Sequence, residues 1–293
     1  MLTLSRLRPT RPLPLLIAAV LVLSAGCAAK NPHVTAADVS TYVALGDSYT
    51  AGVGLAPVSD SVCSRSGSNY PSLLAKALKI KSFTDASCAG ASSSNLHEFQ
   101  KTQKGSNNPQ LEAVSKDTTL VTIGLGLNDG GLSVALLYPC LGVSKPLSDT
   151  CKAYLKAPES TFDAAFRSLG ASVKADLDDI REQAPKARIV LIGYPRMLPD
   201  DRTCPAQLPV PDAAAVRIRW SLKKVNDTLE RSARRARVDY VDMFTASAGH
   251  DVCSKDPWVN GKNVIPGKAL PYHPYAAYHR AVAAKLEGLL SAS

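Results

Sequence analysis

Aromatic side chains make up only 6% of this 293-residue chain, which is little for a protein that binds nucleic acid. A nucleic-acid interface usually combines a basic stripe with aromatics or carries a recognisable fold signature. The formal net charge is +9, but most basic residues are scattered, and the one dense run, RSARRAR at 231–237, is typical of a solvated helix end. We therefore expect no nucleic-acid partner and at most a weak attraction to anionic surfaces.

The seven cysteines include no Cys-x-x-Cys pair, and no His/Cys cluster has the spacing of metal ligands. A zinc site is therefore not expected, and nothing in the sequence calls for a metal or a cofactor. Without Cys27, which is discussed next, six cysteines remain: Cys63, Cys88, Cys140, Cys151, Cys204 and Cys253. An even set in an exported chain predicts three disulfides, although the spacing alone leaves their pairing open.

The N-terminal region has no apolar run long enough to span a bilayer as a mature helix. Three arginines precede the short apolar run 15–23, and small residues follow it, which predicts a signal peptide over residues 1–26. The ending LSAGC resembles a bacterial lipobox, although Ser24 stands where a branched aliphatic residue is preferred. We expect Cys27 to be lipidated and residues 27–40 to form a tether to the membrane. Plain secretion is the alternative.

From residue 41 to residue 293 the pattern predicts a single α/β domain, which we expect to be monomeric. Continuous apolar runs predict buried strands, and apolar residues at spacings of three and four predict helices. The strands are expected at 41–45, 81–87, 118–124, 188–193 and 237–243. One helix is expected at 70–79, and a second is expected to begin at a capping box formed by Ser160 and Asp163. Two more helices are expected to begin near Asp212 and after 273–274. This alternation predicts a parallel sheet with helices on both faces.

Three polar, glycine-bearing turns follow the first three predicted strands, at Gly46-Asp47-Ser48, at 87–94 and at 124–129. Ligands bind outside the carboxyl ends of the strands in such sheets, so these turns should share one site. Ser48 is a candidate nucleophile, or else only the cap of the next helix. The Gly90 N–H and the Asn128 amide are candidate oxyanion donors, or else ordinary turn residues.

A serine nucleophile needs a base, and His273 is the best placed of the five histidines. It stands just before Pro274, at the start of the last predicted helix, where a side chain can point back over the strand ends. His33 lies in the tether, His97 in a polar segment, His250 in a loop, and His279 within the last helix.

The ordered set GDSYTAG, CAGAS, GLND and HP resembles blocks I, II, III and V of the SGNH (GDSL-type) hydrolases, over residues 41 to about 288. The resemblance implies a flavodoxin-like three-layer α/β/α sandwich. It also implies that Ser48 is the nucleophile and His273 the base. The oxyanion hole would consist of the Ser48 N–H, the Gly90 N–H and the Asn128 side chain. No GxSxG motif occurs, so an ordinary α/β-hydrolase is excluded.

The resemblance is closest to the secreted, six-cysteine actinobacterial lipases and esterases of this superfamily. It implies the pairs Cys63–Cys88, Cys140–Cys151 and Cys204–Cys253. One position departs from the family pattern: Leu270 stands where most members have the aspartate of Asp-x-x-His. We expect the Leu270 backbone carbonyl to orient His273 instead, with Asp251 and Asp256 as more distant candidates.

We expect an exported serine esterase or lipase that hydrolyses carboxylic acyl esters through an acyl-enzyme. A carbohydrate deacetylase would use the same chemistry, and a non-catalytic lipoprotein that binds a lipid or glycan is a rival from another class. The apolar insert LSVALLYPCLGV at 132–143 either lines an acyl-chain pocket or packs on the core.

Overall fold

A five-stranded parallel sheet forms the centre of the computed structural model, which describes residues 30–141 and 147–292. Its strands are β1 (Thr41–Gly46), β4 (Ser82–Asp85), β7 (Leu120–Gly124), β8 (Arg188–Ile192) and β9 (Asp239–Val241). Across the sheet they lie in the order β4-β1-β7-β8-β9. Numbered along the chain, this is the flavodoxin-like order 2-1-3-4-5, which confirms the predicted fold class.

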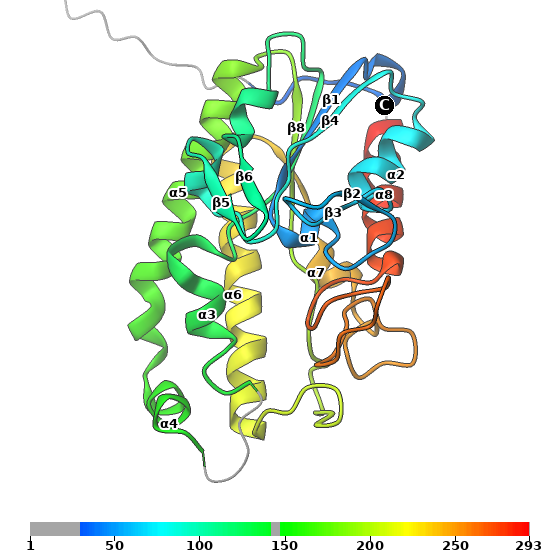
Figure 1. Cartoon of the computed structure of the whole chain (residues 1–293). Coiled ribbons are helices and arrows are strands. Elements are labelled where there is room, and N and C mark those ends of the chain that lie inside the picture. The colour runs from blue at the N-terminus through cyan, green and yellow to red at the C-terminus, as the bar shows by residue number, and fades with distance from the viewer. Residues whose placement is uncertain (1–29, 142–146, 293) are drawn as a thin grey trace, which may run out of the picture.

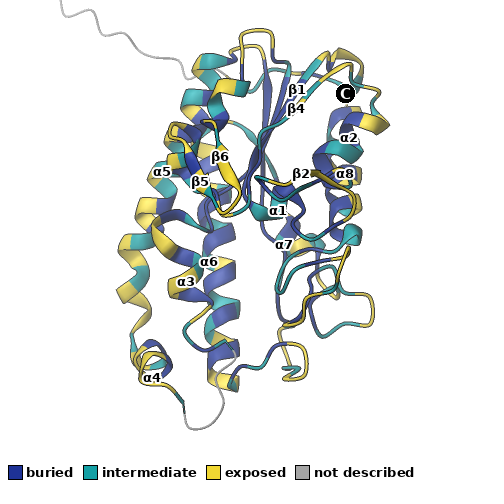
Figure 2. Ribbon diagram, viewed as in Figure 1, coloured by how far each residue is buried: buried dark blue, intermediate teal, exposed yellow. Residues whose placement is uncertain are grey.

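Helices cover both faces of the sheet, as Figure 1 shows. Helices α5 (Asp163–Gln183) and α6 (Asp212–Ala236) lie on one face, and α2 (Tyr70–Ala77) and α8 (Ala276–Ser291) on the other. Alternate residues of β1 belong to two separate cores: Val43 and Leu45 pack toward α5 and α6, and Tyr42 and Ala44 pack toward α2 and α8. Burial on both faces (Figure 2) is the reason that the strands are continuously apolar in sequence.

The start of the helix predicted from Ser160 is wrong. Residues Glu159–Phe162 form a 3-10 turn, η5, and the α-helix begins only at Asp163. The Ser160–Asp163 capping box does not form, because the Asp163 N–H bonds to the Ser160 backbone carbonyl and not to its side chain. Helices α2, α6 and α8 begin within three residues of the predicted positions.

Short elements lie before and between the main strands and helices. They are two hairpins, a set of single-turn helices and a two-turn helix, each too short for a hydrophobic period to reveal. They comprise β2 (Val58–Asp60) with β3 (Arg65–Ser66), β5 (Gln100–Thr102) with β6 (Gly105–Asn107), η1 (Ala36–Asp38), α1 (Ser48–Ala51), η2 (Ser93–Leu96), η3 (Gln110–Ala113), η4 (Asp129–Gly131), α3 (Leu132–Leu136), α4 (Asp149–Lys156) and α7 (Met243–Ala246).

The predicted tether is wrong for residues 31–39, which are docked on the domain. Val34 and Val39 are buried, and the Asn31 amide exchanges hydrogen bonds with the backbone of Ile189 in β8. The reason is that the open end of the sheet offers unpaired backbone groups that an asparagine side chain can satisfy. The predicted signal peptide (1–26) and Cys27 lie outside the described residues. Within the described ranges, none of the helices has both the length and the apolarity needed to cross a bilayer.

All six cysteines from Cys63 onward form disulfides, with the pairing that the family resemblance implied. The pairs are Cys63–Cys88, Cys140–Cys151 and Cys204–Cys253. The prediction of three disulfides is therefore confirmed. Disulfides of this kind are typical of proteins that fold in an oxidising compartment outside the cytosol.

Candidate active site

Ser48 is the first residue of the short helix α1, directly after β1. The cap of this helix is Asp47, whose carboxylate accepts a 2.8 Å hydrogen bond from the Tyr49 N–H. The interpretation of Ser48 as a helix cap is therefore wrong, and its hydroxyl is available for another role. The Ser48 N–H likewise makes no hydrogen bond within the described part of the chain.

The turn before Ser48 is held tightly. A side chain at Gly46 would place its Cβ 2.6 Å from the Gly124 carbonyl oxygen, so only glycine allows β1 and β7 to end so close together. The Gln110 side chain accepts from the Gly46 N–H at 2.7 Å and donates to the Gly46 carbonyl at 2.9 Å. These contacts fix the direction in which the chain leaves the sheet, and therefore the position of Ser48.

A cavity of about 60 Å³ brings three of the predicted residues together: Ser48, Asn128 and His273 line it. It lies beyond the carboxyl ends of β1 and β7, which is the point where the strand order reverses and where ligands bind in such sheets. In the described structure no hydrogen bond joins the Ser48 and His273 side chains. Such bonds are often long before substrate binds.

His273 is oriented by a backbone carbonyl. Its Nδ1 lies 2.8 Å from the Pro271 carbonyl oxygen, which can only accept, so Nδ1 carries the proton and Nε2 has a free lone pair. Burial lowers the pKa of the ring below its usual value, and the bond to Pro271 partly opposes this shift. The imidazole is therefore neutral at neutral pH and can accept a proton through Nε2.

The carbonyl that orients His273 is not the predicted one. The Leu270 carbonyl instead accepts from the His273 backbone N–H at 3.2 Å and from the Asn260 side chain at 2.9 Å. Tyr272 has a φ of 61°, and this left-handed residue turns the chain so that the ring meets the carbonyl two residues back. The prediction of Leu270 is therefore wrong, and the carbonyl beside the ring is that of Pro271.

The two distant carboxylates have other partners. Asp251 is buried and accepts from the Cys253 N–H at 2.8 Å, and the Asp256 carboxylate lies 3.5 Å from the His250 ring. Three of the four other histidines are also engaged elsewhere: His97 near Asp179, His250 stacked on Trp258, and buried His279 accepting from the Tyr70 N–H.

The Asn128 amide is oriented at both ends. Its Oδ1 accepts from the Ser133 hydroxyl at 3.2 Å, and one Nδ2 hydrogen is donated to the Ala91 carbonyl at 3.0 Å. A primary amide has two donor hydrogens, so one remains for a ligand in the cavity.

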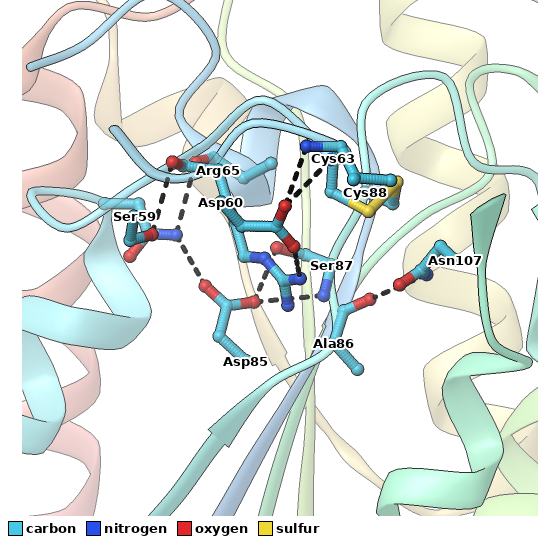
Figure 3. Close-up of polar contacts among 12 residues, drawn as sticks. Ser59, Asp60, Cys63, Arg65, Asp85, Ala86, Ser87, Cys88 and Asn107 are labelled. Carbon is cyan, nitrogen blue, oxygen red and sulfur yellow. Dashed lines mark hydrogen bonds and ion pairs between the residues drawn. A yellow bond between two sulfur atoms is a disulfide. The ribbon is translucent and has the colours of Figure 1, made fainter. Parts of the chain in front are cut away.

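Gly90 is not among the residues that line this cavity. It has a φ of 80°, its N–H makes no hydrogen bond within the described residues, and it lines a neighbouring cleft with Ala89. The turn that carries it is braced by the Cys63–Cys88 disulfide, as Figure 3 shows. Figure 3 also shows Asp85 accepting from the Ser87 N–H, and this 3.0 Å hydrogen bond lies in the segment that leads into the turn.

Tyr194 is a positioning residue that the sequence pattern did not reveal. Its buried hydroxyl donates to the Asp47 carboxylate and accepts from the Leu127 N–H at 3.0 Å. It thereby joins the turn before Ser48 to the loop that carries Asn128. Burial raises the pKa of Asp47 to about 7, although the Tyr194 hydrogen bond lowers it. The signal in the sequence was a hydroxyl two residues after a buried strand, at the same sheet edge as Ser48.

The residues of the apolar insert are divided between the core and the cavity. Leu132 and Leu136 are buried in the core, and Leu137, Tyr138 and Leu141 line the cavity beside Ser48. Residues 142 and 143 of the insert lie outside the described residues.

Comparisons with known proteins show the family of the chain. Residues 44–281 match the family described as GDSL-like Lipase/Acylhydrolase. The chain belongs to this family. It is 31% identical to "Lipase 2" of Streptomyces coelicolor, with 91% of this chain and 92% of that protein covered, and 30% identical to "Lipase" of Streptomyces rimosus, with 93% and 94% covered.

Solved structures give the same result for the fold. The crystal structure of phospholipase A1 from Streptomyces albidoflavus NA297 matches with a TM-score of 0.71 and 29% identity, covering 85% of this chain and 99% of that one. The extracellular lipase from Streptomyces rimosus matches with a TM-score of 0.70 and 27% identity, over 85% and 99% of the two chains. This GDSL-like chain is therefore an exported carboxylic ester hydrolase, as the sequence predicted, rather than a non-catalytic binding protein.

Proposed function

We propose that Ser48 and His273 hydrolyse an acyl ester through a covalent acyl-enzyme. The Ser48 Oγ attacks the acyl carbonyl, and the His273 Nε2 takes the hydroxyl proton and then gives it to the leaving alcohol. A water molecule then attacks the acyl-enzyme, with the His273 Nε2 again taking the proton, and the carboxylic acid is released as Ser48 regains its hydrogen. The observation that carries this proposal is the shared cavity, which Ser48, Asn128 and a neutral His273 with a free Nε2 line together.

The oxyanion of the tetrahedral intermediate would be stabilised by preorganised donors. The Ser48 N–H and the second Asn128 amide hydrogen are free of other partners in the described residues, and both belong to the cavity wall. The family resemblance implies Gly90 as a third donor; its N–H is also unbonded, but Gly90 lines the separate cleft, so its loop would have to meet the substrate from outside the cavity lining. Donors that are already held in place cost no reorganisation in the transition state.

The site works as a Ser48–His273 dyad in this proposal. The Pro271 carbonyl fixes the tautomer of the ring, as the aspartate of a triad does. A neutral carbonyl stabilises the developing imidazolium less than a carboxylate would, so binding and the oxyanion donors carry more of the rate.

The acyl group would lie against the apolar wall of the cavity, formed by Leu137, Leu141 and Met197. The volume of about 60 Å³ is room for a few water molecules, so the cavity holds the first carbons of an acyl chain. Lipase and phospholipase A1 are the names of relatives, and they support a lipid ester as the natural substrate.

A panel of soluble esters from acetyl to palmitoyl, with a phospholipid and an acetylated glycan, tests this proposal. We expect turnover of simple acyl esters, highest for short chains, and a loss of several orders of magnitude in Ser48→Ala with the fold retained. Turnover confined to the acetylated glycan would instead make the protein a deacetylase. Unchanged kcat in a folded Ser48→Ala variant would remove Ser48 from the mechanism.

We also propose that the exported enzyme is tethered to the outer face of the membrane by a diacylglycerol on Cys27. The LSAGC sequence supports this, since the cysteine follows the small residues of a cleavage site. Mass spectrometry of the mature N-terminus is the test. An N-terminus at Cys27 with the added lipid mass is expected, and an unmodified N-terminus would mean a freely secreted enzyme.

A further inference from the structure

A basic groove runs between α5 and α6, away from the active-site cavity. Figure 1 shows the two helices side by side along one face of the sheet. The groove has a volume of about 250 Å³, and no residue that lines it also lines the cavity beside Ser48. Four cations and two hydroxyls are among the lining residues: Arg167, Lys224, Arg231, Arg235, Thr228 and Ser232.

The floor of the groove is polar and fixed. Gly170 lets the two helices approach, because a Cβ there would lie 3.2 Å from the Thr228 methyl group. The buried Ser232 hydroxyl donates to the Gly170 carbonyl at 3.1 Å. Arg231 donates to the buried Thr228 hydroxyl at 2.8 Å, which holds one guanidinium over the floor.

The cations of the groove lack the counter-charges that other basic residues of α6 have. Lys223 pairs with Asp227 at 2.8 Å, and Arg234 pairs with Glu230 at 2.9 Å, on other faces of the helix. Arg167, Lys224 and Arg235 form no ion pair with any described residue.

The groove therefore gathers positive charge around a polar floor. Asp163 is the one acidic side chain that lines it. The four cations repel one another, and a single carboxylate offsets only part of this repulsion. A bound anion would offset more of it.

We propose that this groove binds a phosphoryl group. Guanidinium groups match the oxygens of a phosphate with paired hydrogen bonds, and the groove offers three of them with a lysine. Its volume is below the range of about 300–1,000 Å³ that drug-sized ligands need, so it fits a single headgroup. Free phosphate and an anionic phospholipid headgroup present the same chemistry. The proposal does not depend on the assignment of Ser48.

Titration of the intact protein tests the proposal, with two probes that distinguish these sources. Inorganic phosphate is titrated by calorimetry, and co-sedimentation is measured with vesicles of phosphatidylglycerol and of phosphatidylcholine. We expect binding of at least one anionic probe, weakened by added NaCl because the groove is open to solvent. Binding of phosphate but not of vesicles would identify a soluble ligand, and the reverse would identify a lipid headgroup.

The decisive comparison uses two double variants of equal charge change. Arg231→Gln with Arg235→Gln removes two groove cations, and Lys223→Gln with Arg234→Gln removes two paired cations from the same helix. The groove variant should bind at least about tenfold more weakly, as expected when charge-assisted hydrogen bonds are lost.

The matched control should stay within about threefold of the wild type, since it leaves the groove intact and loses only surface ion pairs. Turnover of a soluble ester should be unchanged in both variants, which shows that they fold. An equal loss in both double variants, or no binding of either anionic probe, would overturn the proposal.

Discussion

Replacing Tyr194 with phenylalanine should lower kcat and leave KM nearly unchanged. The Tyr194 hydroxyl joins the turn before Ser48 to the loop that carries Asn128. Tyr194, Asp47 and Leu127 are 2%, 1% and 6% exposed, so removal of the hydroxyl leaves two largely buried partners. The Leu127 N–H is then left unsatisfied, at a cost of about 1–3 kcal/mol, and Asp47 loses a charge-assisted hydrogen bond. We expect a fall of about 3 kcal/mol in the free energy of unfolding.

The loss of the Tyr194 hydroxyl should lower kcat because it changes the relative position of Ser48 and Asn128. The Tyr194 hydroxyl fixes the loop of Asn128 relative to the turn of Ser48, and a misplacement of about 1 Å can cost a hundredfold in rate. We expect kcat to fall by about ten- to a hundredfold. KM should change little, since Tyr194 does not line the cavity.

The pH dependence gives a readout that a merely structural role would not move. The Tyr194 hydroxyl donates to the Asp47 carboxylate, so the network needs Asp47 ionised, and its pKa is about 7. Burial lowers the pKa of His273, so its neutral, proton-accepting form should be lost only at a pH below that at which Asp47 is protonated. In wild type the rate should therefore begin to fall as the pH drops through about 7. Without the Tyr194 hydrogen bond the pKa of Asp47 rises, and the acid limb moves to higher pH.

The assay is kcat and KM on a soluble short-chain ester between about pH 5 and 9, with thermal unfolding of the same samples. Tyr42→Phe is the matched control, because its buried hydroxyl bonds Thr122 in the core at 2.7 Å. That variant should lose stability without a change in the pH profile. If Tyr194→Phe and Tyr42→Phe have the same kcat and the same acid limb, the positioning role of Tyr194 is refuted.

Two further predictions concern the donors and the base. Asn128→Ala should lower kcat by about a hundred- to a thousandfold at nearly constant KM, and a change in KM alone would mean that Asn128 binds only the ground state. Asp251→Asn and Asp256→Asn, made separately, should each cost less than about tenfold in kcat, against roughly ten-thousandfold for a triad aspartate. A thousandfold loss in either folded variant would show that a carboxylate reaches His273 after all.

Much of the fold was predictable because the strands are buried on both faces. Runs such as 188–193 do not alternate between apolar and polar residues, so they predict buried strands. The carboxyl ends of such strands necessarily meet at one edge of a parallel sheet. That topology is also why Ser48 and Asn128, 80 residues apart, could be expected in one site. The sequence left the role of Ser48 as the cap of α1 open, because Asp47 and Ser48 are both good cap residues and only the backbone decides between them.

The remaining parts of the site depend on backbone geometry and long-range contacts. The left-handed conformation of Tyr272 decides that the Pro271 carbonyl, and not the Leu270 carbonyl, meets the ring. The sequence does not predict this conformation, because tyrosine rarely adopts it. The Tyr194–Asp47 hydrogen bond joins residues 147 positions apart. No local period connects them, so only the folded chain reveals the pair.

Labelling with a serine-reactive phosphonate, followed by peptide mapping, shows directly whether Ser48 is the nucleophile. One adduct is expected, on Ser48, formed by the wild type and absent in Ser48→Ala. Labelling of His273→Ala should be slower by at least about a hundredfold, because the base that activates the hydroxyl is gone. An adduct on another serine, or a Ser48→Ala variant labelled at the wild-type rate, would contradict the account.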